Sequence, residues 1–321
     1  MLNRIHAVWL AVLLVCPTFF AEQASAQTEF NFEAGTFIPV LPDYRAGSIV
    51  GPGFVPVQTN IFEDNQSDIG PQLGLNGFYQ LGRNRRLAFD LDLAWINSMG
   101  STETFADPGP TQSVWFPTLN GTFFLSTPDG GNATFSLDSD VLHYAEYIGI
   151  QQRMQTRFGG LDLGLGFSHF AFEQDHTLDA SFSTGTSGQY IEGLDSDFFG
   201  GELRGTLHRR FRSHPMLIDF GIGLFGMDAD YSGNSLIRNA AGTIVAQESA
   251  TSQVDDFAVT LDIGLRTEKV VRGICVRPNV HLRYISSMPE IHHPQTIVSG
   301  PPVFLDTTDA LVVTTGLEIR L

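Results

Sequence analysis

The stretch from Phe198 to Met227 shows an alternation of apolar and polar residues that much of the chain repeats. Apolar residues stand at every second position on both sides of a basic turn at 209–212, among them Phe199, Leu203, Leu207, Ile218, Ile222 and Leu224. A period of two indicates β-strands, because successive side chains of a strand point to opposite faces. The stretch therefore predicts a hairpin with one apolar face and one polar face.

The same alternation predicts about ten strands, each of roughly the length at which a tilted strand crosses a bilayer. They cover residues 29–37, 69–81, 87–96, 141–151, 158–172, 199–208, 216–227, 254–266, 274–284 and 308–321. In a soluble sandwich the polar face would be outside, whereas in a membrane barrel the apolar face contacts lipid. The alternation by itself does not separate these two folds.

The segments between the predicted strands separate the two folds. Short turns alternate with long segments rich in Gly, Pro, Ser, Thr and Asp. Short turns at one end and long loops at the other are typical of an outer-membrane barrel, and a soluble sandwich gives no reason for this sorting. We therefore predict an all-β transmembrane antiparallel up-and-down barrel of about ten strands (range 8–12), with periplasmic turns and extracellular loops.

Charge follows the same division. The net charge is −17, which argues against nucleic-acid binding. Basic residues gather in the short turns, whereas Arg45 and Arg238 are the basic residues of the long segments, which are acidic. The basic residues of the turns are Arg83, Arg85, Arg86, Arg153, Arg157, Arg209, Arg210, Arg212, Lys269 and Arg272. The sequence thus predicts a molecule with one basic end and one acidic end.

The N-terminus predicts export. Arg4, an apolar run over 7–20 and Ala24-Ser25-Ala26 form the three regions of a cleaved signal peptide over residues 1–26. Val15 disfavours lipidation of Cys16, because a lipidation signal has a small residue before its cysteine. The mature chain, residues 27–321, is predicted to be a single barrel domain that is inserted in the outer membrane after export to the periplasm. Its C-terminal stretch, 314–321, approximates a barrel-targeting signal but ends in Leu rather than the common Phe.

Aromatic residues in the lipid-facing register stand at the long-loop ends of the predicted strands. Rings of this kind form belts at membrane–water interfaces. The predicted girdle consists of Trp95, Phe167, Phe199, Phe257 and Tyr284.

A resemblance to a known family rests on three segments: FGGLDLGLGF at 158–167, DHTLD at 175–179 and DFFGGELR at 197–204. In these segments the chain resembles the Legionella-type major outer membrane protein family, which has related barrels in planctomycetes. The resemblance covers about residues 140–227. It implies a pore-forming β-barrel and carries over no site residues.

Charged residues also occupy the register that faces the lumen. The predicted pore-lining residues are Asp90, Asp92, Asp162, Glu202, Arg204, Asp219, Asp262, Arg277, His281 and Arg283. They would select ions if the lumen is open. Alternatively, they neutralise each other in a lumen that side chains fill. A symmetric turn pairs Arg204 with Asp219 and Asp262 with Arg277, and Arg320 is expected to meet Glu29 or Glu33 where the barrel closes.

Enzymatic and metal-binding hypotheses have weaker support. Asp228 and Asp230 suit the rim of a barrel protease, but no His stands near them in an Asp-x-His pattern. Ser168 and His169 would point to opposite faces of their strand, so they are not expected to bond. His292-His293 is too small a set for a complete metal site. We therefore expect no enzyme activity, no cofactor and no bound metal centre.

The function that the sequence favours is a passive diffusion pore with a weak cation preference. The alternative is a closed structural or surface-recognition barrel whose acidic loops bind a partner, divalent cations or lipopolysaccharide. Aromatic segments at 115–116 and 123–125 either form an extra hairpin, which would give twelve strands, or fold into the mouth. The sequence leaves the solute and the oligomeric state open.

Overall fold

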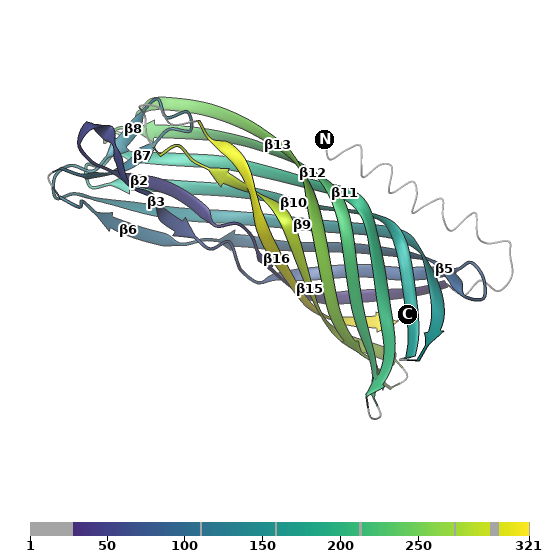
Figure 1. Cartoon of the computed structure of the whole chain (residues 1–321). Helices are drawn as coiled ribbons and strands as arrows, with labels where there is room; N and C mark the ends of the chain where they lie inside the picture. Colours follow the sequence, from purple (N-terminus) through teal and green to yellow (C-terminus); the bar gives the residue numbers. More distant parts are fainter. Residues whose placement is uncertain are drawn as a thin grey trace.

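The chain, described by a computed structural model, folds into a closed ring of antiparallel β-strands (Figure 1). The structure describes residues 28–109, 111–157, 159–211, 214–272, 274–295 and 302–320, so the predicted signal peptide and Leu321 lie outside the described residues. The ring has about 10 strands. They are β1 (Thr28–Val40), β4 (Gly70–Gln80), β5 (Arg85–Met99), β9 (Asn132–Thr156), β10 (Gly159–Phe182), β11 (Ser187–Phe211), β12 (His214–Arg238), β13 (Ile244–Thr267), β15 (Ile274–His292) and β16 (Phe304–Arg320).

Each barrel strand pairs with the barrel strand that follows it along the chain, and β16 pairs with β1 to close the ring. That closing pair runs from Asn31–Arg320 to Val40–Leu311. The backbones of β1 and β16 approach closely at Gly35. A Cβ atom added at this glycine would lie only 2.1 Å from the carbonyl oxygen of Thr315. The predicted all-β transmembrane up-and-down barrel is therefore confirmed, and among the described residues no helix has the length and apolarity to cross a membrane.

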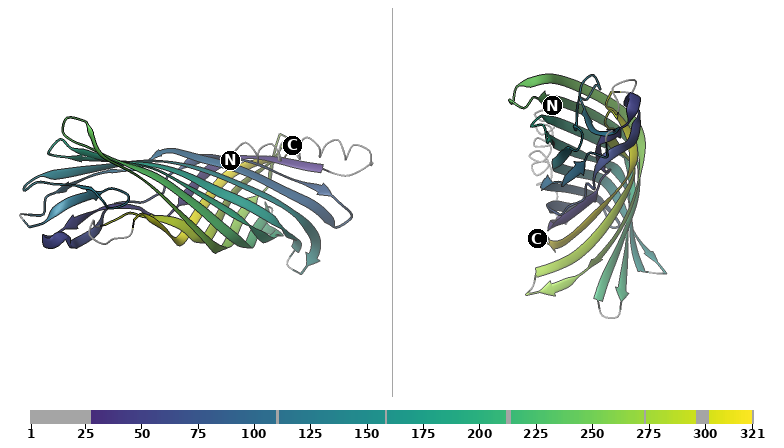
Figure 2. Two further views of the ribbon diagram at one scale, coloured as in Figure 1. Left: turned by 90° about the horizontal axis from the view of Figure 1, so that it is seen from above. Right: turned by 90° about the vertical axis from the view of Figure 1, so that its left-hand side faces the viewer.

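The wall of the barrel has two heights. Strands β9 to β13 each contain 24 or 25 residues, whereas β1 and β4 contain 13 and 11. A tilted strand of about 9–11 residues already crosses a bilayer, so the five long strands extend well beyond it. Figures 1 and 2 show these strands projecting as one curved half-wall on one side of the barrel.

The amphipathic pattern inverts along each long strand. On β12, Leu224 faces outward with 67% exposure, and in the projecting part Asp228 is the outward residue. The inward residues Phe225 and Tyr231 of the projecting part are 1% and 2% exposed. The lower half thus carries apolar side chains outside, where lipid lies, and the upper half carries them inside, where they form a protein core.

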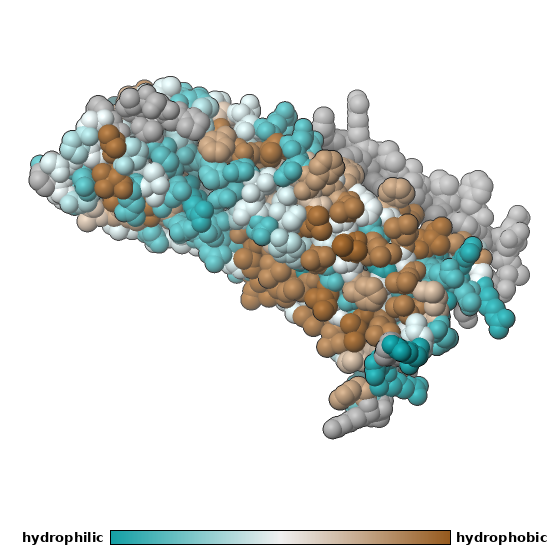
Figure 3. All heavy atoms as spheres, viewed as in Figure 1, coloured by the Kyte–Doolittle hydropathy of each residue, from teal (hydrophilic) through white to brown (hydrophobic). Residues whose placement is uncertain are grey.

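The outward apolar residues of the lower half form a continuous belt. Phe167, Phe257 and Leu165 are 78%, 83% and 67% exposed, although they are large hydrophobic side chains. On the face shown in Figure 3, hydrophobic residues gather over the half of the molecule away from the projecting end. An exposed apolar band of this size is explained by contact with lipid.

The prediction of long loops is wrong in two places, where the structure has continuous strands joined by short turns. Strand β10 continues to Phe182 and β11 begins at Ser187, so residues 183–186 alone connect them, and residues 239–243 connect β12 to β13. The prediction failed because it expected an apolar outer face throughout. Where the strands leave the lipid, their outer residues become polar while the period of two continues.

The other two predicted long segments on the N-terminal side fold into the mouth of the barrel. Their strands are β2 (Tyr44–Val50), β3 (Pro56–Asp64), β7 (Ser113–Pro117) and β8 (Phe124–Ser126), which form a separate four-stranded sheet in the order β3-β2-β7-β8, with the short helix η1 (Pro52–Phe54) between β2 and β3. We call this sheet the plug. Of the two expectations for residues 115–125, the fold into the mouth is confirmed and the extra barrel hairpin is wrong; β6 (Thr102–Ala106) pairs with β9, and β14 (Lys269–Val271) with β15.

Candidate functional site

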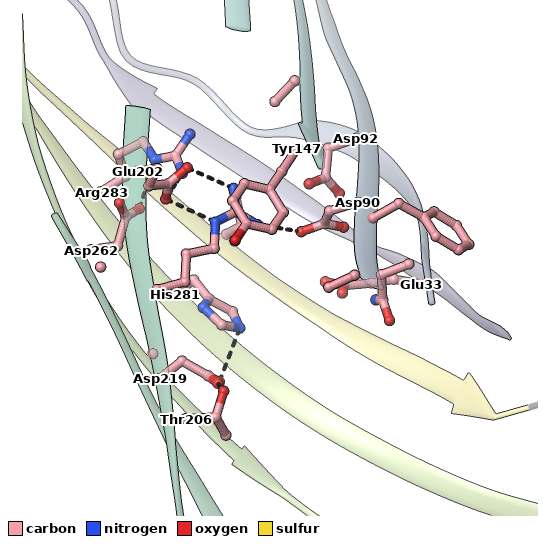
Figure 4. A pocket seen from close by; sticks show the side chains of 18 of the residues that line it. Glu33, Asp90, Asp92, Tyr147, Glu202, Thr206, Asp219, Asp262, His281 and Arg283 are labelled. Atoms are coloured by element: carbon pink, nitrogen blue, oxygen red, sulfur yellow. Dashed lines mark hydrogen bonds and ion pairs between the residues drawn. The ribbon is translucent and has the colours of Figure 1, made fainter. Parts of the chain in front are cut away.

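The interior of the membrane-spanning half is lined by charged residues that the sequence assigned to the lumen. Inward positions of neighbouring strands lie side by side in rows, such as Glu33–Gly74–Asp92 across β1, β4 and β5. Eight of the predicted pore-lining residues surround one cavity of about 280 Å³ (Figure 4). They are Asp90, Asp92, Glu202, Arg204, Asp219, Asp262, His281 and Arg283. A cavity of this volume holds several water molecules, but it is much smaller than an aqueous channel.

Most of these charges are bound to one another. Glu202, whose side chain is 1% exposed, accepts from Arg204 at 2.9 Å and from Arg283 at 3.4 Å. Arg204 also contacts Asp90 at 3.0 Å, and Arg283 contacts Asp262 at 2.6 Å. This network joins β5, β11, β13 and β15 across the lumen.

A second network lies beside it. Arg266 donates two hydrogen bonds to Asp219, at 2.6 and 2.7 Å, and its third nitrogen lies 3.1 Å from Glu318. Arg277 contacts the other oxygen of Glu318 at 2.7 Å and also Glu268 at 2.9 Å. Arg277 therefore faces inward as predicted, but it belongs to this network and not to the cavity wall.

The third network closes the lumen toward the short turns. The carboxylate of Asp162 is 2% exposed and contacts Arg86 at 2.6 Å, Arg153 at 2.8 Å and His208 at 2.8 Å. Three basic groups therefore surround this one carboxylate and separate it from the lumen cavity. Asp162 thus lies inside the barrel, where it binds the basic turn region and is not part of the cavity wall.

The predicted ion pairs are partly wrong. Strand pairing continues to Phe211–His214, which places Arg204 opposite Gly221 and Thr206 opposite Asp219. The pairing is centred one residue later than the prediction assumed, so the partner of each residue is shifted by two positions. Asp262 pairs with Arg283 instead of Arg277. The expected contact of Arg320 with Glu29 at the barrel seam is confirmed, at 2.5 Å.

Above the charged lumen an aromatic layer fills the interior. Phe170 and Phe198 stack with ring centroids 4.4 Å apart, and Phe225 meets Phe170 edge-on at 4.9 Å. Phe37 and Phe172 complete the layer, and all five rings are 0–1% exposed. Sequence reasoning missed this layer, although the signal is present: adjacent aromatic pairs such as 198–199 place one ring on each face of a strand.

The plug seals the mouth above the aromatic layer. Phe116 of β7 is fully buried and stacks on Tyr190 of β11 with centroids 4.3 Å apart. The Tyr190 hydroxyl donates to the carbonyl oxygen of Pro117. In Figure 2, the view into this end shows the plug strands inside the curved half-wall. The interior is thus occupied from the lumen cavity to the outer mouth.

A buried carboxylate fastens the plug to the wall. Glu192 of β11 lies 2.8 and 3.1 Å from Nε2 of His293, and it accepts hydrogen bonds from Tyr44 of β2 and from Tyr231. His293 Nδ1 contacts the carbonyl oxygen of Arg45 at 2.7 Å. Burial alone would raise the pKa of Glu192, yet His293 and the hydroxyls hold it below its ordinary value. Burial opposes the charge on His293 as well, but Glu192 raises the pKa of this imidazole. We call these groups the latch.

A serine–histidine pair lies next to the latch. Ser139, His176 and Glu192 occupy one row across β9, β10 and β11, and Ser139 Oγ is 2.8 Å from Nδ1 of His176. Burial lowers the pKa of His176 to about 4. Both side chains are at most 3% exposed, so the pair is covered by protein and offers no open surface to a substrate.

The other reactive candidates are separated from one another. Ser168 donates to the carbonyl oxygen of Glu146, while His169, on the opposite face, contacts Asp197 at 3.0 Å, as expected from strand alternation. His293 is in the latch, and His292 lies 3.7 Å from Glu290. Within the described ranges, no three His, Cys, Asp or Glu side chains form a group that could hold a metal ion.

An acidic face covers the outside of the projecting half-wall, directly beyond the apolar belt. Its carboxylates come from neighbouring strands, with Asp195 opposite Asp230, and Asp197 and Asp255 on either side of Asp228. Partial burial and the adjacent carboxylates raise the pKa of Asp195 and of Asp228. The sequence analysis placed Asp195, Asp197, Asp228 and Asp230 in long segments between strands, whereas the structure arranges them with Asp255 as a strip on β11, β12 and β13.

The predicted girdle residues all face outward. Phe167, Phe199 and Phe257 are 78%, 57% and 83% exposed, while Trp95 and Tyr284 are half-buried. Phe167, Phe199 and Phe257 lie in the middle of the long strands β10, β11 and β13 and not at strand ends, because these strands continue past the apolar belt. Trp95 lies on β5 and Tyr284 on β15, and both strands also continue beyond these residues. Phe199 and Phe257 lie in one row on either side of Gly226, at the level where outward residues change from apolar to acidic.

No protein-family model matches this chain, and no curated protein is similar to it. Among solved structures it is similar to the outer membrane protease OmpT from Escherichia coli, with a TM-score of 0.44, 8% identity, and coverage of 93% of this chain and 98% of that chain. It is also similar to the outer membrane protein OprG from Pseudomonas aeruginosa, with a TM-score of 0.28, 13% identity, and coverage of 92% and 97%. A third similar structure is a FadL homologue from Pseudomonas aeruginosa, with a TM-score of 0.25, 8% identity, and coverage of 92% of this chain and 90% of that chain. At these TM-scores the likenesses carry no conclusion about the function of this chain.

Proposed function

We propose that this protein is an outer-membrane β-barrel that is closed in the present conformation and presents an acidic recognition surface outside the membrane. The observation that carries this proposal is the filled interior. The aromatic layer and the plug occupy the barrel above the lumen, and ion pairs occupy most of the lumen itself. A passive pore needs a continuous aqueous path, whereas this interior has the packing of a protein core.

The orientation follows from the two ends of the barrel. The short basic turns and the N-terminal end of β1 lie at one end, where Glu29 meets Arg320. In outer-membrane barrels this end faces the periplasm, and the end with the longer connections faces outward. The half-wall, the plug and the acidic face therefore project from the outer surface of the cell.

The acidic face supports a role in recognition. Its carboxylates lie just beyond Phe199 and Phe257, at the depth where lipid headgroups meet water. Such a strip attracts cationic groups and repels anionic ones. It fits either a cationic partner or divalent cations that bridge it to the phosphate groups of lipopolysaccharide.

Conductance in planar lipid bilayers tests the closed state. We expect the folded wild-type protein to give no discrete conductance steps at protein loadings at which a known diffusion porin, used as the control, gives them. Insertion is verified independently by protease protection of the membrane-spanning half. Regular steps from inserted wild-type protein would contradict the closed barrel.

A passive diffusion pore with a weak cation preference is the second candidate, and the cavity of about 280 Å³ in the lumen favours it. It requires the plug and the aromatic layer to move out of the mouth. If such a pore conducts, Asp92→Lys is expected to shift the reversal potential in a salt gradient toward anion preference, because this carboxylate lines the cavity. An unchanged reversal potential would place Asp92 outside the ion path.

A further inference from the structure

One wall of the lumen cavity holds two carboxyl groups that form no ion pair with a protein cation within the residues that the structure describes. Glu33 of β1 is 9% exposed and Asp92 of β5 is half-buried, and both line the cavity. Each arginine of the cavity wall is bound to another carboxylate: Arg86 to Asp162, Arg204 to Asp90 and Glu202, Arg266 to Asp219 and Glu318, and Arg283 to Asp262 and Glu202. Among the described residues, no basic nitrogen lies within 4.0 Å of Glu33 or Asp92.

Two amide oxygens on the same wall also lack partners. Gln72 is 7% exposed; its Nε2 donates to Asp92 at 3.2 Å, and its Oε1 has no hydrogen-bond donor. Asn31 is 4% exposed; its Nδ2 donates to Asn76 at 2.7 Å, and its Oδ1 has no donor. Buried acceptors are rarely left unpaired, so this wall has more oxygen acceptors than the protein supplies donors for.

The glycine between the two carboxylates keeps the space open. Glu33, Gly74 and Asp92 lie in one row, and a Cβ at Gly74 would come 2.6 Å from Oδ1 of Asp92 and 3.3 Å from Cβ of Glu33. In Figure 4 the carboxylates of Glu33, Asp90 and Asp92 gather on one side of the cavity, opposite the arginine-bearing side. Carboxylates without a cationic partner are costly away from bulk water, and a bound cation or a proton removes this cost. The unpaired amide oxygens beside them accept hydrogen bonds from the water shell of a cation.

We propose that the lumen binds one hydrated divalent cation of the Mg²⁺ class between Glu33 and Asp92, with the free amide oxygens of Gln72 and Asn31 facing its water shell. Two carboxylate charges match the charge of one divalent ion, and all donors are oxygens, which hard cations prefer. Mg²⁺ commonly keeps several waters and uses one or two carboxylates. This mode agrees with the absence, in the described part of the chain, of three convergent acidic, His or Cys ligands.

Isothermal titration of the chelator-treated, detergent-solubilised full chain with MgCl₂ tests this site. We expect one binding event whose affinity falls at least tenfold in Asp92→Asn and in Glu33→Gln. Gly74→Ala, which changes no charge, is expected to weaken binding because it narrows the space between the carboxylates. Asp179→Asn on the outer surface removes an equal charge and serves as the matched control.

Two results would overturn the proposal. The first is a wild-type protein that binds no Mg²⁺, which would mean that Glu33 and Asp92 are neutralised by protons. The second is binding that persists in both lumen variants and disappears in Asp228→Asn, which would place the cation on the acidic face. The three lumen variants change different properties, so a folding failure of one leaves the others decisive. Neither result depends on whether the barrel conducts ions.

Discussion

Replacement of Glu192 with alanine is expected to lower the free energy of unfolding by about 3–5 kcal/mol, the usual cost of removing one partner of a buried ion pair. The variant leaves the His293 imidazole and the Tyr44 and Tyr231 hydroxyls buried without their acceptor. Because Tyr44 belongs to the plug, the plug should loosen as well. Urea-induced unfolding in detergent measures the first effect, and limited proteolysis of residues 41–68 measures the second.

The latch also predicts a pH dependence. The lowered pKa of Glu192 gives stability that is present above the ordinary carboxyl pKa of 4.5 and is lost as the pH falls through the lowered value. The raised pKa of His293 gives stability that is complete below the ordinary imidazole pKa of 6.5 and is lost as the pH rises through the raised value. The stability difference between wild type and Glu192→Gln should therefore be largest between pH 4.5 and 6.5.

A matched control separates the latch from general charge effects. Asp175→Ala removes an exposed carboxylate from the same half-wall, and we expect it to change stability by less than about 1 kcal/mol. A difference between wild type and Glu192→Gln that stays constant from pH 4 to pH 9 would contradict the charged latch. Equal protease sensitivity of the plug in Glu192→Ala and in wild type would contradict its fastening role.

Replacement of Arg266 with glutamine is expected to destabilise the barrel by about 3–5 kcal/mol. Arg266 holds Asp219 with two hydrogen bonds and contacts Glu318, so one side chain joins β12, β13 and β16. Asp219→Asn is expected to cost a similar amount, because it leaves the guanidinium with one charged partner fewer in the lumen. The double variant should cost less than the sum of the two single variants, since the two residues interact directly.

The control for this cycle is Arg45→Gln. Arg45 contacts Asp43, Glu63 and Glu290 outside the membrane, and its side chain is 35% exposed. Exposed ion pairs contribute about 0–1 kcal/mol, so this variant should unfold close to wild type. Additive effects of Arg266→Gln and Asp219→Asn would show that the lumen is wet enough to screen their contact, and would favour the pore over the closed barrel.

The sequence by itself determined that the chain forms a barrel, and which residues of its membrane-spanning strands face the lipid and which face the lumen. Where strands such as β11 and β12 cross the lipid, water and lipid on opposite faces require an alternation that any reader of the sequence can detect. Ten strands, their lipid-facing residues and the inward placement of Glu202, Arg204 and Asp219 follow from this period of two. A contact of Arg320 with Glu29 or Glu33 also followed, because closure of a barrel brings the first and last strands together, and the structure shows the contact with Glu29.

The tertiary structure alone decided what fills the barrel. Beyond the membrane the outer face of each strand meets water, so the alternation of apolar and polar residues inverts. Acidic residues such as Asp228 therefore resemble loop residues in the sequence, although the strand continues through them. Contacts that join distant segments, such as Glu192 with His293 or Phe116 with Tyr190, leave no local period. The plug, the latch and the partners within the ion-pair networks depend on register and long-range packing, which a single strand's alternation does not encode.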